Sequence, residues 1–306
     1  MSYTLHQLRI FTKVCEFQSV TKASEALFLT QPAISIQLKK LQDEFEIPLT
    51  EVIGRQLYIT DFGKQIEKLA LDILEKADGI NSAADQYKGI LTGQIKIASA
   101  STGKYVIPYF LTGFMRKYPG VNISIDVTNK TRVVENLQEN SVDFAMISVL
   151  PDNLVLEHVP LIENELHLVA SSNYPGLPKR MTPKNLENYP LIFREDGSAT
   201  RAAMKHFLNQ NQIQVKRSMQ LVSNEAVKQG VRAGLGLSIM PLIGVRTELM
   251  LQNMKIIPMR GLPIRSQWKL AYSSGKQLSP ASLALLEYIN ENKERISEEH
   301  FGKVEF

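Results

Sequence analysis

The first 60 residues show apolar positions at helical spacing in three short runs, within 5–15, 20–27 and 34–45. This spacing predicts three helices with tight connections. Thr21 is expected to cap the second helix and Thr30 the third, where Pro32 fits the first turn because the N–H groups there have no partner within the helix. Gly54 lies between two short alternating segments, which predicts a hairpin between Leu49 and Thr60.

From Phe62 to Tyr87 the chain has no proline and repeats apolar residues at intervals of three and four. Such a pattern predicts one long helix with a narrow apolar seam. The seam either packs on its own domain or joins a second copy of the chain, and we favour the second interpretation because the helix links two regions of different texture. Its members are Ile66, Leu69, Ala70, Ile73, Leu74, Ala77, Ile80, Ala84 and Tyr87.

After Gly93, strand patterns alternate with helix patterns for more than 200 residues. This alternation predicts an α/β domain with mostly parallel strands, long enough for two lobes. The strands are expected at 94–99, 121–127, 142–149, 166–170, 191–193, 237–240 and 268–273, and the helices at 105–117, 131–140, 200–209, 225–233 and 280–295.

The second and third helices have the dimensions of a helix-turn-helix, whose second helix lies in the DNA major groove. With Ile34 buried, a rotation of 100° per residue turns Ser35, Ile36 and Lys39 outward. Residues near the start of the helix are then expected to read base edges, and Lys39 and Lys40 to contact phosphates. An exposed Ile36 suits contact with a thymine methyl group. The alternative is an ordinary amphipathic helix with a solvated face, which spacing alone leaves open.

A resemblance adds to this interpretation. The segment LRIFTKVCEFQSVTKASEALFLTQPAISIQLKKLQDEF at 8–45, with TDFG at 60–63, resembles the winged helix-turn-helix of LysR-type transcriptional regulators. The segments STGKYVIPYF (101–110), FREDGSATRAAMKHFL (193–208), SNEAVKQGVRAGLGLSIMP (223–241) and GLPIRSQWKLAYSSGKQLSP (261–280) are similar to the regulators of RuBisCO and other carbon-fixation operons.

The resemblance implies a winged helix-turn-helix at 1–60, a dimerising linker helix at 61–90, and a two-lobed effector domain shaped like a periplasmic binding protein at 91–306. Its first lobe is expected at 91–161 and 267–306, and its second at 162–266. The implied partners are promoter DNA, a second copy in a dimer or tetramer, a small co-inducer and RNA polymerase. The DNA-binding residues that follow from motif and spacing are Thr21, Thr30, Gln31, Pro32, Ser35, Ile36, Lys39, Lys40 and Arg55.

Two positions depart from the family pattern. The wing has Thr50, Glu51 and Val52 where the family commonly has an aromatic residue followed by Glu-Arg, which leaves Arg55 as its main cation. Ile36 stands where the family often has arginine, so a common base or phosphate contact is absent.

Three expected helix starts in the C-terminal domain, at 99–102, 197–201 and 223–224, are candidates to converge on a cleft. Helix N-termini present free N–H donors that suit a carboxylate or phosphate, and lysine and arginine add charge. Taken singly, Thr102, Thr200 and Asn224 are better explained as helix caps. The predicted effector-binding residues are Ser99, Ser101, Thr102, Lys104, Thr200, Arg201 and Asn224.

Composition narrows the alternatives. The chain has 306 residues, 44% of them hydrophobic, one cysteine and a net charge of +4. These proportions exclude collagenous, disordered and disulfide-stapled classes, and the unpaired cysteine favours the cytoplasm. No signal segment or run long enough to span a membrane is visible, so no membrane partner is expected. Residues 1–60 are formally neutral and residues 91–306 carry the positive excess, in the domain expected to bind an anion.

Motifs for catalysis and metal binding are not found. Lys104 follows Gly103, but Ala98 and Tyr105 replace the other residues of a phosphate-binding loop. The five histidines are scattered, and neither a zinc pattern nor a nucleophile elbow is present. We therefore expect neither an enzyme nor a cofactor, but a DNA-binding regulator that responds to a small anionic metabolite. The alternative function is that of a solute-binding protein.

Overall fold

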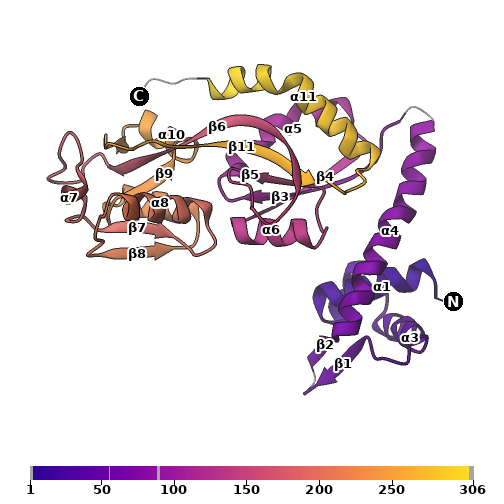
Figure 1. Cartoon of the computed structure of the whole chain (residues 1–306). Helices are drawn as coiled ribbons and strands as arrows, with labels where there is room; N and C mark the ends of the chain where they lie inside the picture. Colours follow the sequence, from indigo (N-terminus) through magenta and orange to yellow (C-terminus); the bar gives the residue numbers. More distant parts are fainter. Residues whose placement is uncertain (1–2, 55, 88–89, 303–306) are drawn as a thin grey trace. The chain divides into compact units, whose positions relative to one another are not determined.

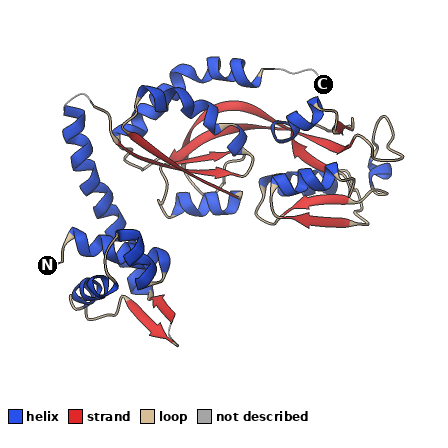
Figure 2. Cartoon of the chain, turned by 180° about the vertical axis from the view of Figure 1, so that it is seen from behind, coloured by secondary structure: helices blue, strands red, loops and turns tan. Residues whose placement is uncertain are grey.

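A computed structural model describes residues 3–54, 56–87 and 90–302. The chain divides into two compact units, Met1–Ile90 and Leu91–Phe306. Each unit is described by itself below (Figures 1 and 2).

The N-terminal unit is a three-helix core followed by a hairpin and a long helix. Thr4 forms a capping box with Gln7 at the start of the first helix. Phe11, Ile34 and Leu41 are fully buried in the shared core. The elements are α1 (Leu5–Phe17), α2 (Val20–Leu27), α3 (Gln31–Gln42), β1 (Thr50–Ile53), β2 (Gln56–Ile59) and α4 (Asp61–Tyr87), and β1 pairs antiparallel with β2 as a wing.

The start of α2 corrects one sequence expectation. The helix begins at Val20, and Ser19 rather than Thr21 caps it, because the Ser19 Oγ accepts from the Lys22 N–H. Thr21 is therefore exposed within the first turn. Thr30 does precede α3, but its side chain makes no capping hydrogen bond. The hydroxyl of Thr30 is thus not used to hold the helix.

The TDFG segment joins the wing to α4. The Thr60 hydroxyl donates to the Pro48 carbonyl at 2.6 Å and accepts from the Gly63 N–H at 2.9 Å. A side chain at residue 63 would collide with the Leu49 carbonyl, so glycine lets α4 pass directly over the start of the wing.

Helix α4 divides its apolar residues between two faces. Ala70 and Leu74 are buried in the core beneath α1. Leu69, Ile73 and Ile80 are 57%, 40% and 71% exposed, at spacings of four and seven residues. The predicted single seam is therefore two stripes, one packed within this unit and one facing outward. Ala84 and Tyr87, which the sequence places in the same seam, have side chains outside those described.

The C-terminal unit is a two-lobed α/β structure in which strands and helices alternate (Figure 1). Elements of its first part are β3 (Gly93–Ala100), a short 3-10 turn (Gly103–Tyr105), α5 (Ile107–Lys117), β4 (Val121–Thr128), α6 (Lys130–Gln138), β5 (Phe144–Ile147) and β6 (Leu156–Ser171). They are followed by α7 (Pro183–Leu186), β7 (Leu191–Arg194), α8 (Ala199–Gln210), β8 (Ser218–Leu221), α9 (Asn224–Arg232), β9 (Ser238–Pro241), α10 (Leu242–Met250), β10 (Met254–Ile256), β11 (Ile264–Ser273) and α11 (Pro280–Phe301).

Two long antiparallel strands, β6 and β11, run from one lobe into the other. The main sheet has the order β10-β6-β11-β5-β3-β4, with β9 also paired to β6. β3 pairs parallel with β4 and β5, but every pair that β6 or β11 makes is antiparallel. The expectation of mostly parallel strands was thus wrong for this sheet. The sequence predicted only the second half of β6, at 166–170. In the first half, the apolar alternation is interrupted by Glu157, Pro160 and Glu163.

Each lobe has its own core. Ile97, Phe110 and Phe144 belong to the first lobe, where α6 covers one face of the sheet and α5 with α11 covers the other (Figures 1 and 2). Phe193 and Met204 belong to the second lobe, where α8 packs on β7. The lobes therefore behave as two packed bodies joined mainly by the strands that cross between them.

Candidate functional site

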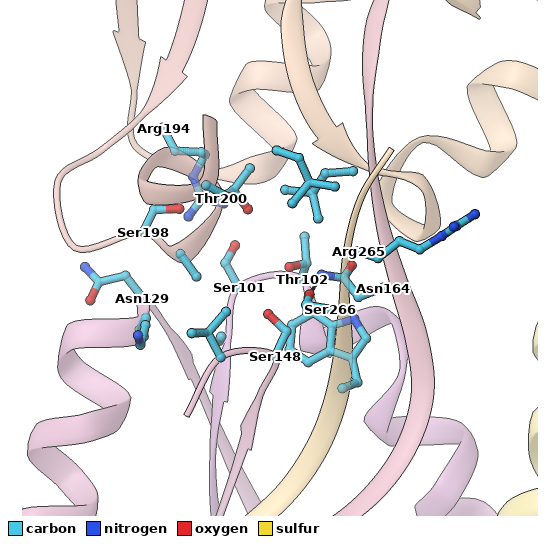
Figure 3. Close-up of a pocket in the computed structure, with 18 residues that line it drawn as sticks. Ser101, Thr102, Asn129, Ser148, Asn164, Arg194, Ser198, Thr200, Arg265 and Ser266 are labelled. Carbon is cyan, nitrogen blue, oxygen red and sulfur yellow. Dashed lines mark hydrogen bonds between the residues drawn. The ribbon is translucent and has the colours of Figure 1, made fainter. Parts of the chain in front are cut away.

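A cavity of about 120 Å³ lies between the two lobes. The first lobe lines it with 100–102 at the end of β3, 129–130 at the start of α6 and 148–149 after β5. The second lobe contributes Arg194 and 198–200 at the start of α8. The crossing strands supply 164, 166, 264–266 and 268. Figure 3 shows these side chains converging from both lobes.

The charged residues that line the cavity are all basic. They are Lys130, Arg194 and Arg265, and no acidic residue is among the described lining residues. Arg194 is 4% exposed, and its guanidinium binds both carboxylate oxygens of Glu195, at 2.7 and 2.8 Å. The cavity therefore has a positive bias, part of which Glu195 offsets.

Arg265 makes a smaller contribution to this bias. Its Nε lies 2.9 Å from the Glu165 carboxylate, and its side chain extends away from the other labelled residues in Figure 3. Burial opposes ionisation of Glu165, but hydrogen bonds with Arg265 and His167 outweigh burial and lower the pKa of this carboxyl. The two charges thus balance each other at the edge of the cavity.

Helix α8 begins at the cavity with free hydrogen-bonding groups. Ser198 is its N-cap and is 6% exposed, yet its hydroxyl makes no capping hydrogen bond. The first N–H groups of a helix have no intrahelical acceptor, and the helix dipole makes this end partly positive. The Ser198 and Thr200 hydroxyls lie beside this end in Figure 3. This arrangement can bind a carboxylate or phosphate oxygen.

Three of the predicted effector-binding residues line the cavity: Ser101, Thr102 and Thr200. Ser99 lies behind the wall, fully buried, where its hydroxyl donates to the Ala100 carbonyl. Side chains alternate between the two faces of β3, so Ser99 turns to the opposite side from its neighbour Ala100, which lines the cavity.

Lys104 and Arg201 lie elsewhere, which corrects their predicted placement. The Lys104 ammonium stands 5.1 Å from the centre of the Tyr105 ring and lines no part of the cavity. Arg201 follows Thr200 on α8 and is rotated away from the cavity by about 100°. Its guanidinium donates to the Arg194 carbonyl and pairs with Asp196 at 2.8 Å. Arg194, not Arg201, is the arginine of this lobe that reaches the cavity.

Asn224 belongs to a second polar cluster, which joins the lobes outside the cavity. It is 1% exposed and lies against Gly244. Nearby, Lys228 bridges Glu225 and Glu248 at 3.0 and 2.9 Å. Burial opposes the charge on Lys228, but the hydrogen bonds to Glu248 and Glu225 outweigh it and raise its pKa. The Tyr105 hydroxyl of the first lobe donates to Glu225 of the second. Asn224 thus lies buried within the second lobe beside this contact and does not line the cavity.

The lobes also touch at the rim of the cavity. The Thr131 N–H at the start of α6 donates to the Gly197 carbonyl at 3.3 Å. Gly197 has φ +83°, and a side chain there would approach the Thr131 Oγ1 to 2.7 Å. Glycine is therefore needed at residue 197 for two reasons, the left-handed backbone conformation and the close approach of α6.

Several lining residues were missed by sequence reasoning. Arg194 ends an apolar strand, a position where a buried arginine is unusual and could have been noticed. Ser266 lies opposite Asn164 because β6 and β11 pair there, and Trp268 lies where this pairing shifts register, between Gln267 and Lys269. Other polar lining residues that were not predicted are Asn129, Lys130, Ser148, Ser198 and Arg265.

The predicted DNA-reading face of α3 is exposed as the spacing requires. Ile34, Leu38 and Leu41 are buried, while the opposite side is open and includes an isoleucine that is 55% exposed. The exposed residues are Gln31, Pro32, Ser35, Ile36, Lys39 and Lys40, with Thr30 at the start of the helix. Arg55 of the wing lies outside the described residues.

The structure adds one residue to this surface. Phe28, in the turn between α2 and α3, is 95% exposed and adopts a left-handed conformation at φ +55°. The left-handed backbone ends α2, where the Phe28 N–H donates to the Glu25 carbonyl, but the exposed ring is not needed for this and stands out beside the start of α3.

Other chemistry is limited in the part of the chain that the structure describes. No three His, Cys, Asp or Glu side chains there gather as metal ligands. Burial and then the nearby Glu67 raise the pKa of the Cys15 thiol above its usual range, so this thiol stays protonated. Within the same residues, no helix is both long and apolar enough to cross a membrane.

A winged helix-turn-helix followed by a two-lobed domain with an internal polar cavity defines a DNA-binding protein with its own ligand-sensing domain. Residues 5–64 match the family described as bacterial regulatory helix-turn-helix protein, lysR family. Residues 88–294 match the LysR substrate binding domain. The chain belongs to the LysR family of transcriptional regulators, which does not favour the alternative of a solute-binding protein.

Its relatives are transcriptional regulators. The HTH-type transcriptional activator CmpR of Synechocystis is 35% identical over 295 residues, covering 96% of this chain and 97% of that protein. The RuBisCO operon transcriptional regulator of Allochromatium vinosum is 35% identical over 290 residues, covering 94% of this chain and 96% of that protein.

Two solved structures extend the comparison. The CcmR regulatory domain of Synechocystis in complex with 2-PG (2-phosphoglycolate) matches 66% of this chain and 98% of its own, with 31% identity and a TM-score of 0.62. Full-length CbnR complexed with its target DNA matches 94% of this chain and 99% of its own, at 21% identity and a TM-score of 0.67. The second likeness shows that the fold is shared along nearly the whole chain.

Proposed function

We propose that this regulator senses a small anionic metabolite in the cavity between its lobes. The observation that carries the proposal is that every charged residue lining the cavity is basic and that the start of α8 opens onto it. An anion there gains the Lys130 charge, the Arg194 guanidinium and the free N–H groups of the helix. The CcmR regulatory domain, whose complex contains 2-PG, supports an anionic ligand.

The relatives support a role in controlling carbon-fixation genes. Two of them are RuBisCO operon regulators, and the identity extends over more than nine-tenths of each chain. We assign the chain to this functional subgroup, with promoter DNA and RNA polymerase as its partners. It works as a DNA-bound regulator in the cytoplasm, with no catalytic role and no cofactor beyond the co-inducer.

The ligand would act by favouring one arrangement of the lobes. A ligand that touches both lobes binds best when they are closed and therefore shifts the equilibrium toward that state. In a dimer or tetramer, this shift changes the spacing of the paired α3 helices on the promoter. The tetramer, like the lobe boundaries at 161–162 and 266–267, is part of this proposal.

The effector site can be tested with two matched lysine variants. We expect Lys130→Ala to weaken the binding of 2-PG by about tenfold, since one unscreened charge contact in a cavity is worth about 1.4 kcal/mol. Lys104→Ala should leave binding unchanged, because Lys104 does not line the cavity. Calorimetric titration of the full-length protein gives both affinities. The proposed site would be refuted if both variants lost the same affinity for 2-PG. It would also be refuted if neither the variants nor the native chain bound 2-PG.

The DNA-reading face of α3 gives a second expectation. Lys39→Ala should weaken binding to all DNA duplexes about equally and reduce the salt slope by about one unit, because it removes one phosphate contact. Ile36→Ala should instead change the preferred sequence. The probes are duplexes selected from a random pool by the native protein. Lys13→Ala, on α1 and paired with Glu16, is the control and should change neither. A loss of sequence preference in Lys39→Ala would contradict the assignment.

A further inference from the structure

Two deeply buried polar atoms at the cavity have no hydrogen-bond partner among the described residues. They are the Asn164 Oδ1 and the Trp268 Nε1. Their side chains are 5% and 1% exposed, and both line the cavity. The other end of the Asn164 amide is held in place, because its Nδ2 donates to the Ser266 hydroxyl at 2.9 Å.

These two atoms make opposite demands on a ligand. The Asn164 oxygen is an acceptor and the Trp268 N–H is a donor. A carboxylate or phosphate oxygen can only accept, so it satisfies the indole but leaves the amide oxygen unpaired. A hydroxyl group can donate to one and accept from the other. Since unpaired buried groups are costly, a hydroxyl is the group that suits this wall.

The unpaired Asn164 oxygen lies away from the basic end of the cavity. In Figure 3, Arg194, Ser198 and Thr200 lie together on one side, and Asn164, Ser266 and Thr102 lie together on the other. The amide is supplied by β6 and Ser266 by β11, whereas Arg194 and the start of α8 come from the second lobe, and Lys130 comes from the start of α6. One wall thus suits negative charge and the other suits a neutral group that both donates and accepts.

We infer that the effector is a hydroxylated anion, whose hydroxyl is recognised by Asn164 and Trp268 while its anionic group binds at the start of α8. This inference rests on the proposed anionic effector and goes beyond it. It distinguishes the effector from 2-PG, which has no hydroxyl group. A simple anion still binds, but leaves the amide oxygen without a partner.

Matched pairs of anions test the inference on the full-length protein at pH 8, where carboxylates and phosphate monoesters carry essentially no proton. The pairs are malate with succinate, and glycerol 3-phosphate with n-propyl phosphate. We expect the hydroxylated member of at least one pair to bind at least about tenfold more tightly than its partner. Only the hydroxylated anion can form hydrogen bonds with both the Asn164 Oδ1 and the Trp268 Nε1. Equal affinities within both pairs would overturn the inference but leave the anion site standing. If the protein bound neither 2-PG nor any of these four anions, both the inference and the proposed anion site would be overturned.

Two variants assign the preference to the two side chains. Asn164→Leu and Trp268→Phe should each bring the affinity ratio of the preferred pair close to one, while binding of the non-hydroxylated member is retained. Asn211→Leu is the control, because its amide donates to the Phe207 carbonyl at the far end of α8. A ratio that persists in both variants would overturn the inference. If one variant does not fold, the other decides the same question.

Discussion

The double variant Leu69→Glu/Ile73→Glu is expected to halve the mass of the protein assembly in solution. It should also lower the affinity for a duplex with two half-sites by about 100-fold. This loss is the avidity gained when two paired DNA-binding units bind the same duplex. Leu69 and Ile73 are 57% and 40% exposed on one stripe of α4, where an apolar surface gains most by meeting a second copy. Covering such a side chain is worth about 1.5–3 kcal/mol, and a two-fold interface counts each residue twice.

Leu71→Glu is the matched control for this prediction. Leu71 is also exposed on α4, at 46%, but lies about 200° around the helix axis from Leu69. It makes the same leucine-to-glutamate change as at residue 69, with one added charge instead of two, and should alter neither mass nor affinity. Light scattering against the 34.5 kDa protomer gives the mass, and fluorescence anisotropy gives the affinity. If both kinds of variant behave alike, the outward stripe of α4 is not the interface.

The second large effect is expected for Gly197→Ala, which should weaken effector binding by about tenfold while leaving DNA binding in place. The new Cβ would stand 2.7 Å from the Thr131 Oγ1, so the second lobe must move away from α6. If the ligand binds only the closed arrangement of the lobes, its apparent affinity falls as the closed population falls. A penalty of about 1.4 kcal/mol on closure lowers that population, and therefore the affinity, about tenfold.

Gly234→Ala separates the collision from backbone strain. Gly234 has φ +79°, close to that of Gly197, but a Cβ there meets nothing within 4 Å. Both variants should be destabilised by about 1–2 kcal/mol through the left-handed backbone, as measured by thermal unfolding. Only Gly197→Ala should also weaken binding of 2-PG in calorimetry. A similar loss of binding in Gly234→Ala would mean that the contact between Gly197 and Thr131 does not control closure.

Sequence reading succeeded where the signal is local. The buried and exposed faces of α3 follow from helical periodicity, and the wing follows from Gly54 between two short alternating runs. It was least successful in β6, where acidic residues and Pro160 interrupt the pattern of a strand whose two ends lie in different lobes. A strand that changes surroundings along its length has no single periodicity to detect.

The predictions for the cavity divide in the same way. Ser101, Thr102 and Thr200 were predicted because helix starts have recognisable residues, and all three line the cavity. Arg201 was predicted because it lies within a helix start, yet its guanidinium is held by Asp196 and the Arg194 carbonyl. One residue along a helix turns a side chain by about 100°, which periodicity near a helix end does not resolve.

The sequence by itself determined the LysR family, the order of its helix-turn-helix, linker helix and α/β domain, and the face of α3 that is free to meet DNA. These depend on motifs and on the period of apolar residues, which are local properties of the chain. Only the tertiary structure decided which cations reach the cavity, which stripe of α4 stays uncovered, and that Asn164 and Trp268 line one cavity. These depend on the register of β6 with β11 and on packing between segments about 100 residues apart, which no local pattern records.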